Sequence, residues 1–136
     1  MTNKNPLGQA ATEIAQQQLQ KLRAATTGIT SAVLLSSDGF EVTSLETDKG
    51  KASRLAAMGS SLAAISSAIA KEAGISECRR LIVESEEGVV AVMTVPDSSP
   101  PLVLAVVAND ASRLGQLLWG AKHCCAALSQ ELKEVS

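Results

Sequence analysis

Aromatic side chains are almost absent from this chain of 136 residues, in which Phe40 and Trp119 are the only two and tyrosine is missing. Platforms that stack nucleic-acid bases, aromatic cages and a large aromatic core are therefore excluded. A strong charge of either sign is missing as well. Because 12 lysines and arginines face 14 aspartates and glutamates, we expect no basic surface that could neutralise phosphates, and no nucleic-acid partner.

Residues that carry out chemistry are also scarce. His123 is the only histidine, and it diverges from its neighbour Cys124 on a helix, which argues against a nucleophile and base pair there. Cys124 and Cys125 beside a single histidine do not match the spacings of zinc sites, and neither G-x-x-x-x-G-K-S/T nor G-x-G-x-x-G is present. We predict a non-enzyme without cofactor or metal. A thiol enzyme using Cys78 or Cys124 stays a less favoured alternative.

No targeting or membrane segment is apparent. Residues 1–6 are polar, and no uncharged apolar stretch approaches the roughly 20 residues that a membrane helix needs. Three cysteines, two of them adjacent, do not form a disulfide framework and favour reduced thiols. We therefore expect a soluble cytoplasmic protein without membrane insertion, folded as one domain over residues 1–136.

Hydrophobic spacing predicts helices and strands in the order αββαβββα. Gly74 is expected to end the middle helix, because glycine readily adopts the left-handed conformation that closes many helices. Asn109 or Asp110 is expected to cap the last helix. The expected ranges are 8–25 and 51–73 for the first two helices, and 30–36, 40–45, 79–84, 89–95 and 102–108 for the strands, with the final helix after residue 110.

The pattern of apolar and charged residues along the strands indicates how the layers are arranged. Strands around Val33, Val92 and Val106 are apolar on successive residues, so both of their faces must be covered. The strands around Phe40 and Leu81 carry charges and suit the edges of a sheet. The fold class predicted is α/β (α+β): a three-layer α-β-α sandwich with a five-stranded, mainly antiparallel sheet. We expect the middle helix on one face of the sheet and the two terminal helices on the other.

The middle helix has no charged side chain from Leu55 to Ala70. Its bulky residues follow a three-four spacing and are expected to lie on the sheet; they are Leu55, Met58, Leu62, Ile65 and Ile69. The opposite side is small and uncharged, which favours close packing against a second copy of the helix in a C2 dimer. The residues expected at that dimer interface are Ala56, Ser60, Ala63, Ala64 and Ser67. The alternative is an ordinary solvated helix surface.

Three segments carry a resemblance to a known family. Residues 31–42 (SAVLLSSDGFEV), 55–62 (LAAMGSSL) and 81–90 (LIVESEEGVV) are similar to the roadblock (dynein light chain seven) family, including its MglB-like bacterial members. The likeness extends from about residue 10 to 130. It implies a roadblock/profilin-like fold that dimerises through the middle helix and the edge strand after it. The strand residues implied at the interface are Arg79, Arg80, Leu81, Ile82 and Val83.

The resemblance also implies a function. Family members are regulators or platforms for Ras-like small GTPases, or adaptor subunits of dynein, and in bacterial members the GTPase docks over the paired middle helices. Charged residues at the helix ends would then be candidates for partner binding, although ordinary solvated charges explain them equally well; they are Lys51, Arg54, Lys71 and Glu72. The predicted function is therefore a homodimeric scaffold or GTPase regulator. A small-ligand-sensing αβα module is the alternative.

Trp119 and His123 lie four residues apart on the last helix, which places them on the same side. Because tryptophan is enriched at interaction hot spots, the pair could mark a second partner site. We favour a simpler interpretation, in which Trp119 covers the seam between the first and last helices.

Overall fold

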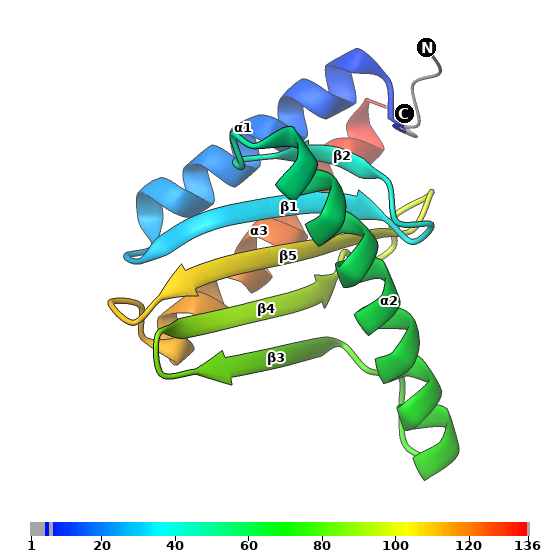
Figure 1. The fold of residues 1–136 in the computed structure, drawn as a ribbon. Helices are drawn as coiled ribbons and strands as arrows, with labels where there is room; N and C mark the ends of the chain where they lie inside the picture. The colour runs from blue at the N-terminus through cyan, green and yellow to red at the C-terminus, as the bar shows by residue number, and fades with distance from the viewer. Residues whose placement is uncertain (1–4, 6, 136) are drawn as a thin grey trace.

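The computed structural model describes residue 5 and residues 7–135. Within these residues the elements follow the predicted order αββαβββα (Figure 1). The helices are α1 (Gln9–Ala25), α2 (Lys49–Ala73) and α3 (Leu114–Glu134). The strands are β1 (Ile29–Ser36), β2 (Glu41–Ser44), β3 (Arg80–Ser85), β4 (Gly88–Thr94) and β5 (Leu102–Asn109).

Two helix starts differ from expectation because of their caps. Asp48 accepts a hydrogen bond from the backbone N–H of Lys51 at 3.1 Å, so α2 begins two residues earlier than predicted, at Lys49. The expected cap of α3 by Asn109 or Asp110 is wrong. Asn109 Oδ1 instead accepts from the backbone N–H of Ala111 at 2.9 Å, which makes a turn, and α3 starts after Arg113 without a side-chain cap.

The sheet is antiparallel throughout, with the strand order β2-β1-β5-β4-β3 (Figure 1). The predicted edges are confirmed, because the short β2 and the charged β3 lie at the two ends of the order. The three strands with continuous apolar runs occupy the middle, where helices cover both faces.

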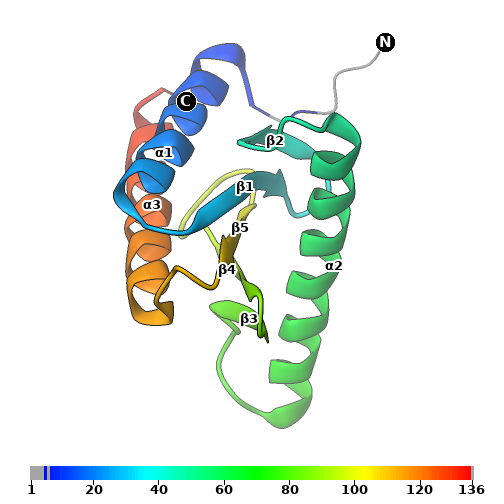
Figure 2. The ribbon, with the colours of Figure 1, turned by 60° about the vertical axis from the view of Figure 1, so that its left-hand side comes forward.

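The three layers are visible edge-on in Figure 2, where α1 and α3 lie on one face of the sheet and α2 on the other. Alternate residues of β1 pack into two different hydrophobic cores, one on each face of the sheet. Leu34 belongs to the larger core under α1 and α3, which also contains Leu19 and Leu117. Its neighbours Val33 and Leu35 belong to the smaller core under α2. The arrangement predicted for the layers is confirmed.

The orientation of α2 differs from the prediction. Met58, Ile65 and Ile69 are 54, 55 and 63% exposed, so these members of the bulky stripe do not lie on the sheet. Small residues take that place: Ala56 is fully buried, and a Cβ at Gly59 would sit 3.4 Å from Leu35 Cδ2. Leu55 and Leu62, the other two members of the stripe, are partly buried and pack on this core, as predicted. The small residues beside them let the helix backbone come close to the sheet.

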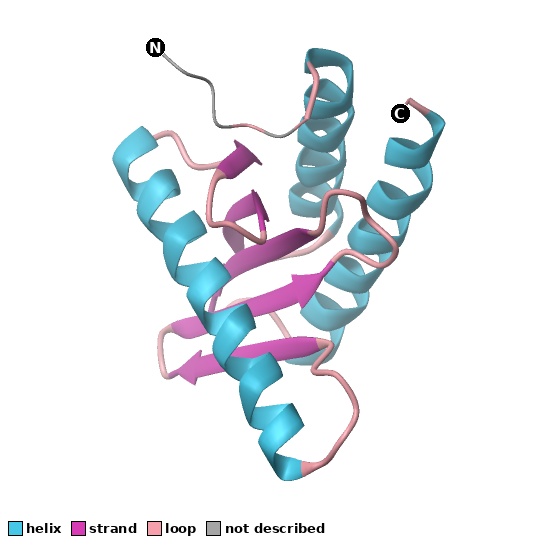
Figure 3. Cartoon of the chain, turned by 90° about the vertical axis from the view of Figure 1, so that its right-hand side faces the viewer, coloured by secondary structure: helices cyan, strands magenta, loops and turns pink. Residues whose placement is uncertain are grey.

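The helix α2 also crosses the sheet obliquely, and its C-terminal end projects beyond β3 (Figures 1 and 3). Gly74 ends it in the left-handed conformation, as predicted from the sequence. Within the described part of the chain, no helix combines the length and apolarity required to cross a bilayer.

Candidate functional site

Large apolar side chains gather on the outer side of α2 and on β3. Met58, Ile65 and Ile69 are separated by seven and four residues, so they share one side of α2. Ile75, just after the helix, is 68% exposed, and Val83 of β3 is 47% exposed. We call these five residues the α2–β3 face. A single domain rarely leaves so many large apolar side chains in water without an interaction to cover them.

The strand β3 adds an open edge to this face. Its residues pair with β4 alone in the described sheet, from Arg80 opposite Met93 to Ser85 opposite Gly88. Leu81 packs on the core under α2, and Val83, two residues along, points to the same side of the sheet. An edge strand presents unpaired backbone groups that can pair with another strand. Apolar side chains and backbone groups able to form hydrogen bonds therefore lie next to each other.

The small residues expected at the dimer interface differ in how far the structure buries them. Ala56 is completely buried against the chain's own sheet, so its assignment to the interface is wrong. Ser60 is partly buried, and its hydroxyl donates to the backbone oxygen of Ser37 at 2.7 Å. Ala63 packs partly on the same core, whereas Ala64 and Ser67 are exposed. Of the five small residues, Ala64 and Ser67 are therefore the ones whose side chains are exposed on the single chain.

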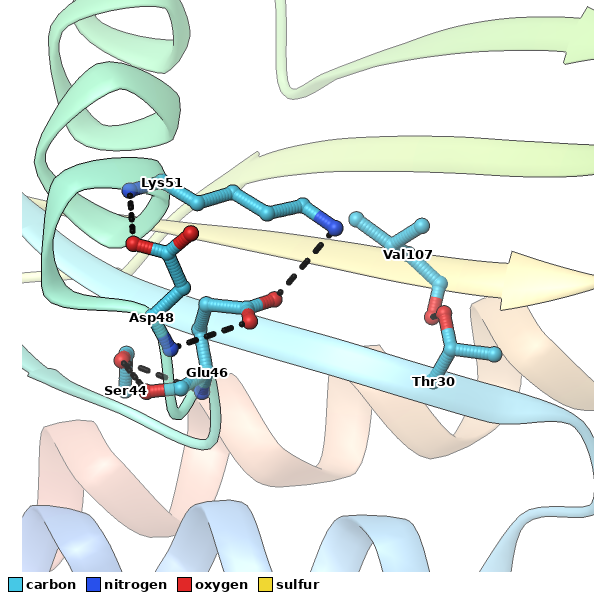
Figure 4. A network of polar contacts seen from close by, with 6 residues as sticks. All are labelled: Thr30, Ser44, Glu46, Asp48, Lys51 and Val107. Carbon is cyan, nitrogen blue, oxygen red and sulfur yellow. Dashed lines mark hydrogen bonds and ion pairs between the residues drawn. The ribbon is translucent and has the colours of Figure 1, made fainter.

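The charged candidates at the ends of α2 fall into two separate groups. Lys51 is engaged within the chain: its ammonium group lies 3.6 Å from Glu46 Oε2, beside the cap formed by Asp48 (Figure 4). Arg54 is exposed one turn further along, and Lys71 and Glu72 are exposed at the far end. At 1.5 Å per residue, Arg54 and Lys71 are roughly 25 Å apart along the helix. A single small ligand cannot contact both groups, whereas a protein partner can.

Trp119 does not cover the seam between α1 and α3, which was the favoured interpretation of the sequence. Its side chain is 67% exposed, and its ring lies against that of His123 with a centroid distance of 3.8 Å. The seam is closed instead at Gly120, where a Cβ would lie 2.6 Å from Thr26 Oγ1 and 3.3 Å from Leu22 Cδ1.

The cysteines do not form a reactive cluster. Cys124 and Cys125 are buried beneath α1, and burial raises the pKa of each thiol to about 12. A thiol with so high a pKa is a poor nucleophile near neutral pH. Cys78 lies elsewhere, before β3, where its thiol donates to the backbone oxygen of Arg80 at 3.1 Å. Among the described residues, no group of three or more potential ligands could hold a metal ion.

Burial predicts how the three thiols react with a disulfide reagent such as 5,5′-dithiobis(2-nitrobenzoate). We expect the partly exposed Cys78 to react quickly in the folded chain, whereas Cys124 and Cys125 react only when the chain unfolds. The released thiolate chromophore measures this as one fast equivalent in buffer and three in denaturant. Cys78→Ser is the control and should remove the fast equivalent alone. Rapid reaction of all three thiols in buffer would contradict the buried placement.

Comparison with known proteins identifies the family. A family model for the Roadblock/LC7 domain matches residues 15–108, from within α1 to the last strand of the sheet. The chain belongs to the Roadblock/LC7 family. The resemblance noted in the sequence is therefore confirmed. The chain has no significant sequence match among curated proteins.

Solved structures of this family share the fold over most or all of the chain. The gliding protein MglB from Thermus thermophilus superimposes with a TM-score of 0.82 at 21% identity, covering 98% of this chain and 99% of that one. Myxococcus xanthus MglB gives a TM-score of 0.80 at 15% identity, covering 100% and 96% of the two chains. A Roadblock/LC7 domain from Streptomyces avermitilis gives 0.78 at 24% identity, covering 86% and 96%. At such identities the likeness shows a common roadblock architecture.

Proposed function

We propose that this chain is a non-enzymatic, homodimeric regulatory or scaffold module of the Roadblock/LC7 family that binds a Ras-like small GTPase or a related signalling assembly. The observation that carries the proposal is the α2–β3 face, which combines exposed apolar side chains with an open strand edge. Membership of the family supports the regulatory role. MglB, a structural relative, has also been solved in a tetrameric arrangement.

The proposed dimer joins two copies through the α2–β3 face. A two-fold axis beside β3 would pair the two β3 edges antiparallel and extend the sheet across both chains. Arg79 to Val83 and the side of α2 that carries Met58, Ile65 and Ile69 would then form one continuous interface. Ser67, two residues from both isoleucines, lies on nearly the opposite side of the helix and stays outside this contact. Because β3 and α2 are neighbours in one chain, a single contact buries both the apolar side chains and the unpaired backbone groups.

The GTPase in this proposal docks over the two adjacent α2 helices. The central part of α2 carries no charge from Leu55 to Ala70, so polar contacts with the partner must come from the helix ends. Arg54, Lys71 and Glu72 are exposed and available there, whereas Lys51 is already engaged by Glu46. Paired helices would present two copies of these groups, spaced to contact a protein rather than a small molecule.

The test is affinity capture: the protein is immobilised and exposed to extract of the source cell, to which either a non-hydrolysable GTP analogue or GDP has been added. The captured proteins are identified by mass spectrometry. We expect one Ras-like GTPase to be recovered preferentially in one nucleotide state. Recovery should fall at least about tenfold for the double variant Arg54→Glu, Lys71→Glu, since reversing charges in a contact adds repulsion. Arg23→Glu is the matched control, because Arg23 lies on α1, across the sheet from α2. The proposed partner is wrong if no such GTPase appears in either state.

A further inference from the structure

The helices α1 and α3 lie on the face of the sheet opposite to α2 (Figure 2), and residues of both helices line a groove between them. Its volume is about 870 Å³, which is in the range of pockets that take small molecules. Leu22, Ala25 and Trp119 are among its apolar lining residues, and Gln18 and Gln116 are among its polar ones. This mixture of apolar walls with a few polar groups is typical of ligand sites.

The groove exists because the two helices approach closely at Gly120 and carry small residues on the outward side of that contact. Gly120 brings α3 against Thr26 and Leu22 of α1, which closes the base of the groove. On the outward side, a Cβ at Gly115 would meet nothing within 4 Å. Further along, the amide of Gln18 donates to Glu131 at 2.8 Å and fixes α1 to α3. The groove is therefore a preformed feature of the helix pair.

The chemistry of the lining favours an aromatic anion. Trp119 and His123 form an aromatic wall, with rings tilted by 56° and the indole largely exposed, against which a planar ring can stack. Lys21 adds an amino group at the end of a long side chain, the one lysine among the described lining residues. The described residues that line the groove include no carboxylate, so no lining side chain neutralises the charge of Lys21. A ligand complementary to both features carries a flat apolar body and a negative group.

We propose that this groove binds a planar aromatic carboxylate, with the ring system against the indole of Trp119 and the carboxylate at the ammonium group of Lys21. The long side chain of Lys21 can follow the carboxylate along the groove. Because the sheet separates this site from α2, ligand binding here and self-association through the α2–β3 face use different surfaces.

The test is a titration of ¹⁵N-labelled protein with 2-naphthoate, followed by NMR. Trp119 is the only tryptophan, so a single indole N–H signal reports on the groove. We expect a saturable shift of this signal with a dissociation constant of about 1 mM or below, as the size of the probe suggests. Lys21→Gln should weaken binding roughly three- to fivefold, because an exposed ion pair contributes modestly. The neutral amide, 2-naphthamide, should bind the wild-type protein about three- to fivefold more weakly than 2-naphthoate does.

Two further variants separate the groove from other apolar surfaces. Gly115 lines the groove and a Cβ there would meet nothing within 4 Å, so we expect Gly115→Leu to occupy the groove and abolish the saturable shift while the chain stays folded. Lys49→Gln removes an exposed positive charge on α2 and should leave the affinity unchanged. The proposal is overturned if no saturable indole shift occurs, if Gly115→Leu binds normally, or if the acid and the amide bind equally well. A failure to capture a GTPase would leave these results unaffected.

Discussion

Replacing Ile65 and Ile69 together with glutamate should convert the proposed homodimer into a folded monomer. Both side chains are more than half exposed in the single chain, so the change leaves its core intact. In the dimer, each substitution removes apolar contact and places a carboxylate in an apolar interface. A combined cost of about 4 kcal/mol or more corresponds to a dissociation constant raised by at least roughly a thousandfold. Sedimentation equilibrium, with circular dichroism to confirm folding, measures both parts of this expectation.

A matched control comes from the opposite side of the sheet. Leu114, at the start of α3, is 37% exposed, and Leu114→Glu changes an exposed apolar residue outside the α2–β3 face. This variant should retain the wild-type mass, which we expect to be twice the 14.0 kDa of the chain. A wild-type protein that sediments as a monomer at micromolar concentration would contradict the dimer directly, without reference to any variant.

The order of the elements and the edges of the sheet could be predicted because they depend on local patterns. Continuous apolar runs such as the one around Val106 identify strands that are covered on both faces, and the structure places them in the middle of the sheet. The charged run around Leu81 identifies an edge. These signals are contained in a few consecutive residues, and the rest of the fold does not override them.

The rotation of α2 about its axis could not be predicted in the same way. A helix that is uncharged on all sides gives no polar face to identify the solvent side, so the spacing predicts that its bulkiest stripe lies on the sheet. The outcome depended on the strands, whose residues Val33, Leu35 and Val103 already fill the space under the helix. A complementary surface must then be shallow, and Ala56 and Gly59 provide it. The positions of those strand side chains are known only after the sheet has formed.

The groove was missed for a related reason. The sequence shows Trp119 at the correct helical spacing to lie near α1, but it does not show how close the two helices come. Gly120 packs against Leu22 and Thr26 at this seam, and the indole of Trp119 is left 67% exposed beside it. A glycine one residue from a tryptophan, facing a neighbouring helix, is the signal that could have indicated this arrangement.

The second large effect is expected at Gly28, in the turn between α1 and β1. Gly28 has a φ of +91°, and a Cβ there would lie 2.7 Å from the backbone nitrogen of Ser112 and 2.9 Å from Asn109 Oδ1. The turn cannot easily move away, because the N–H of Asn109 donates to the Gly28 oxygen at 2.8 Å. We expect Gly28→Ala to lower the free energy of unfolding by about 2 to 4 kcal/mol, from the strained φ and the displaced backbone together.

Gly115→Ala is the matched control for this prediction. Gly115 lies within α3, where a Cβ meets nothing within 4 Å, so the same substitution should stabilise the chain by about 0.5 to 1 kcal/mol through helix propensity. Urea unfolding followed by circular dichroism measures both changes. Both should be made in the Ile65→Glu, Ile69→Glu background, because association would make the apparent stability depend on protein concentration. Equal effects of the two glycine substitutions would show that the turn at Gly28 does not pack against Asn109 and Ser112, at the end of β5 and before α3, as closely as the 2.7 Å approach requires.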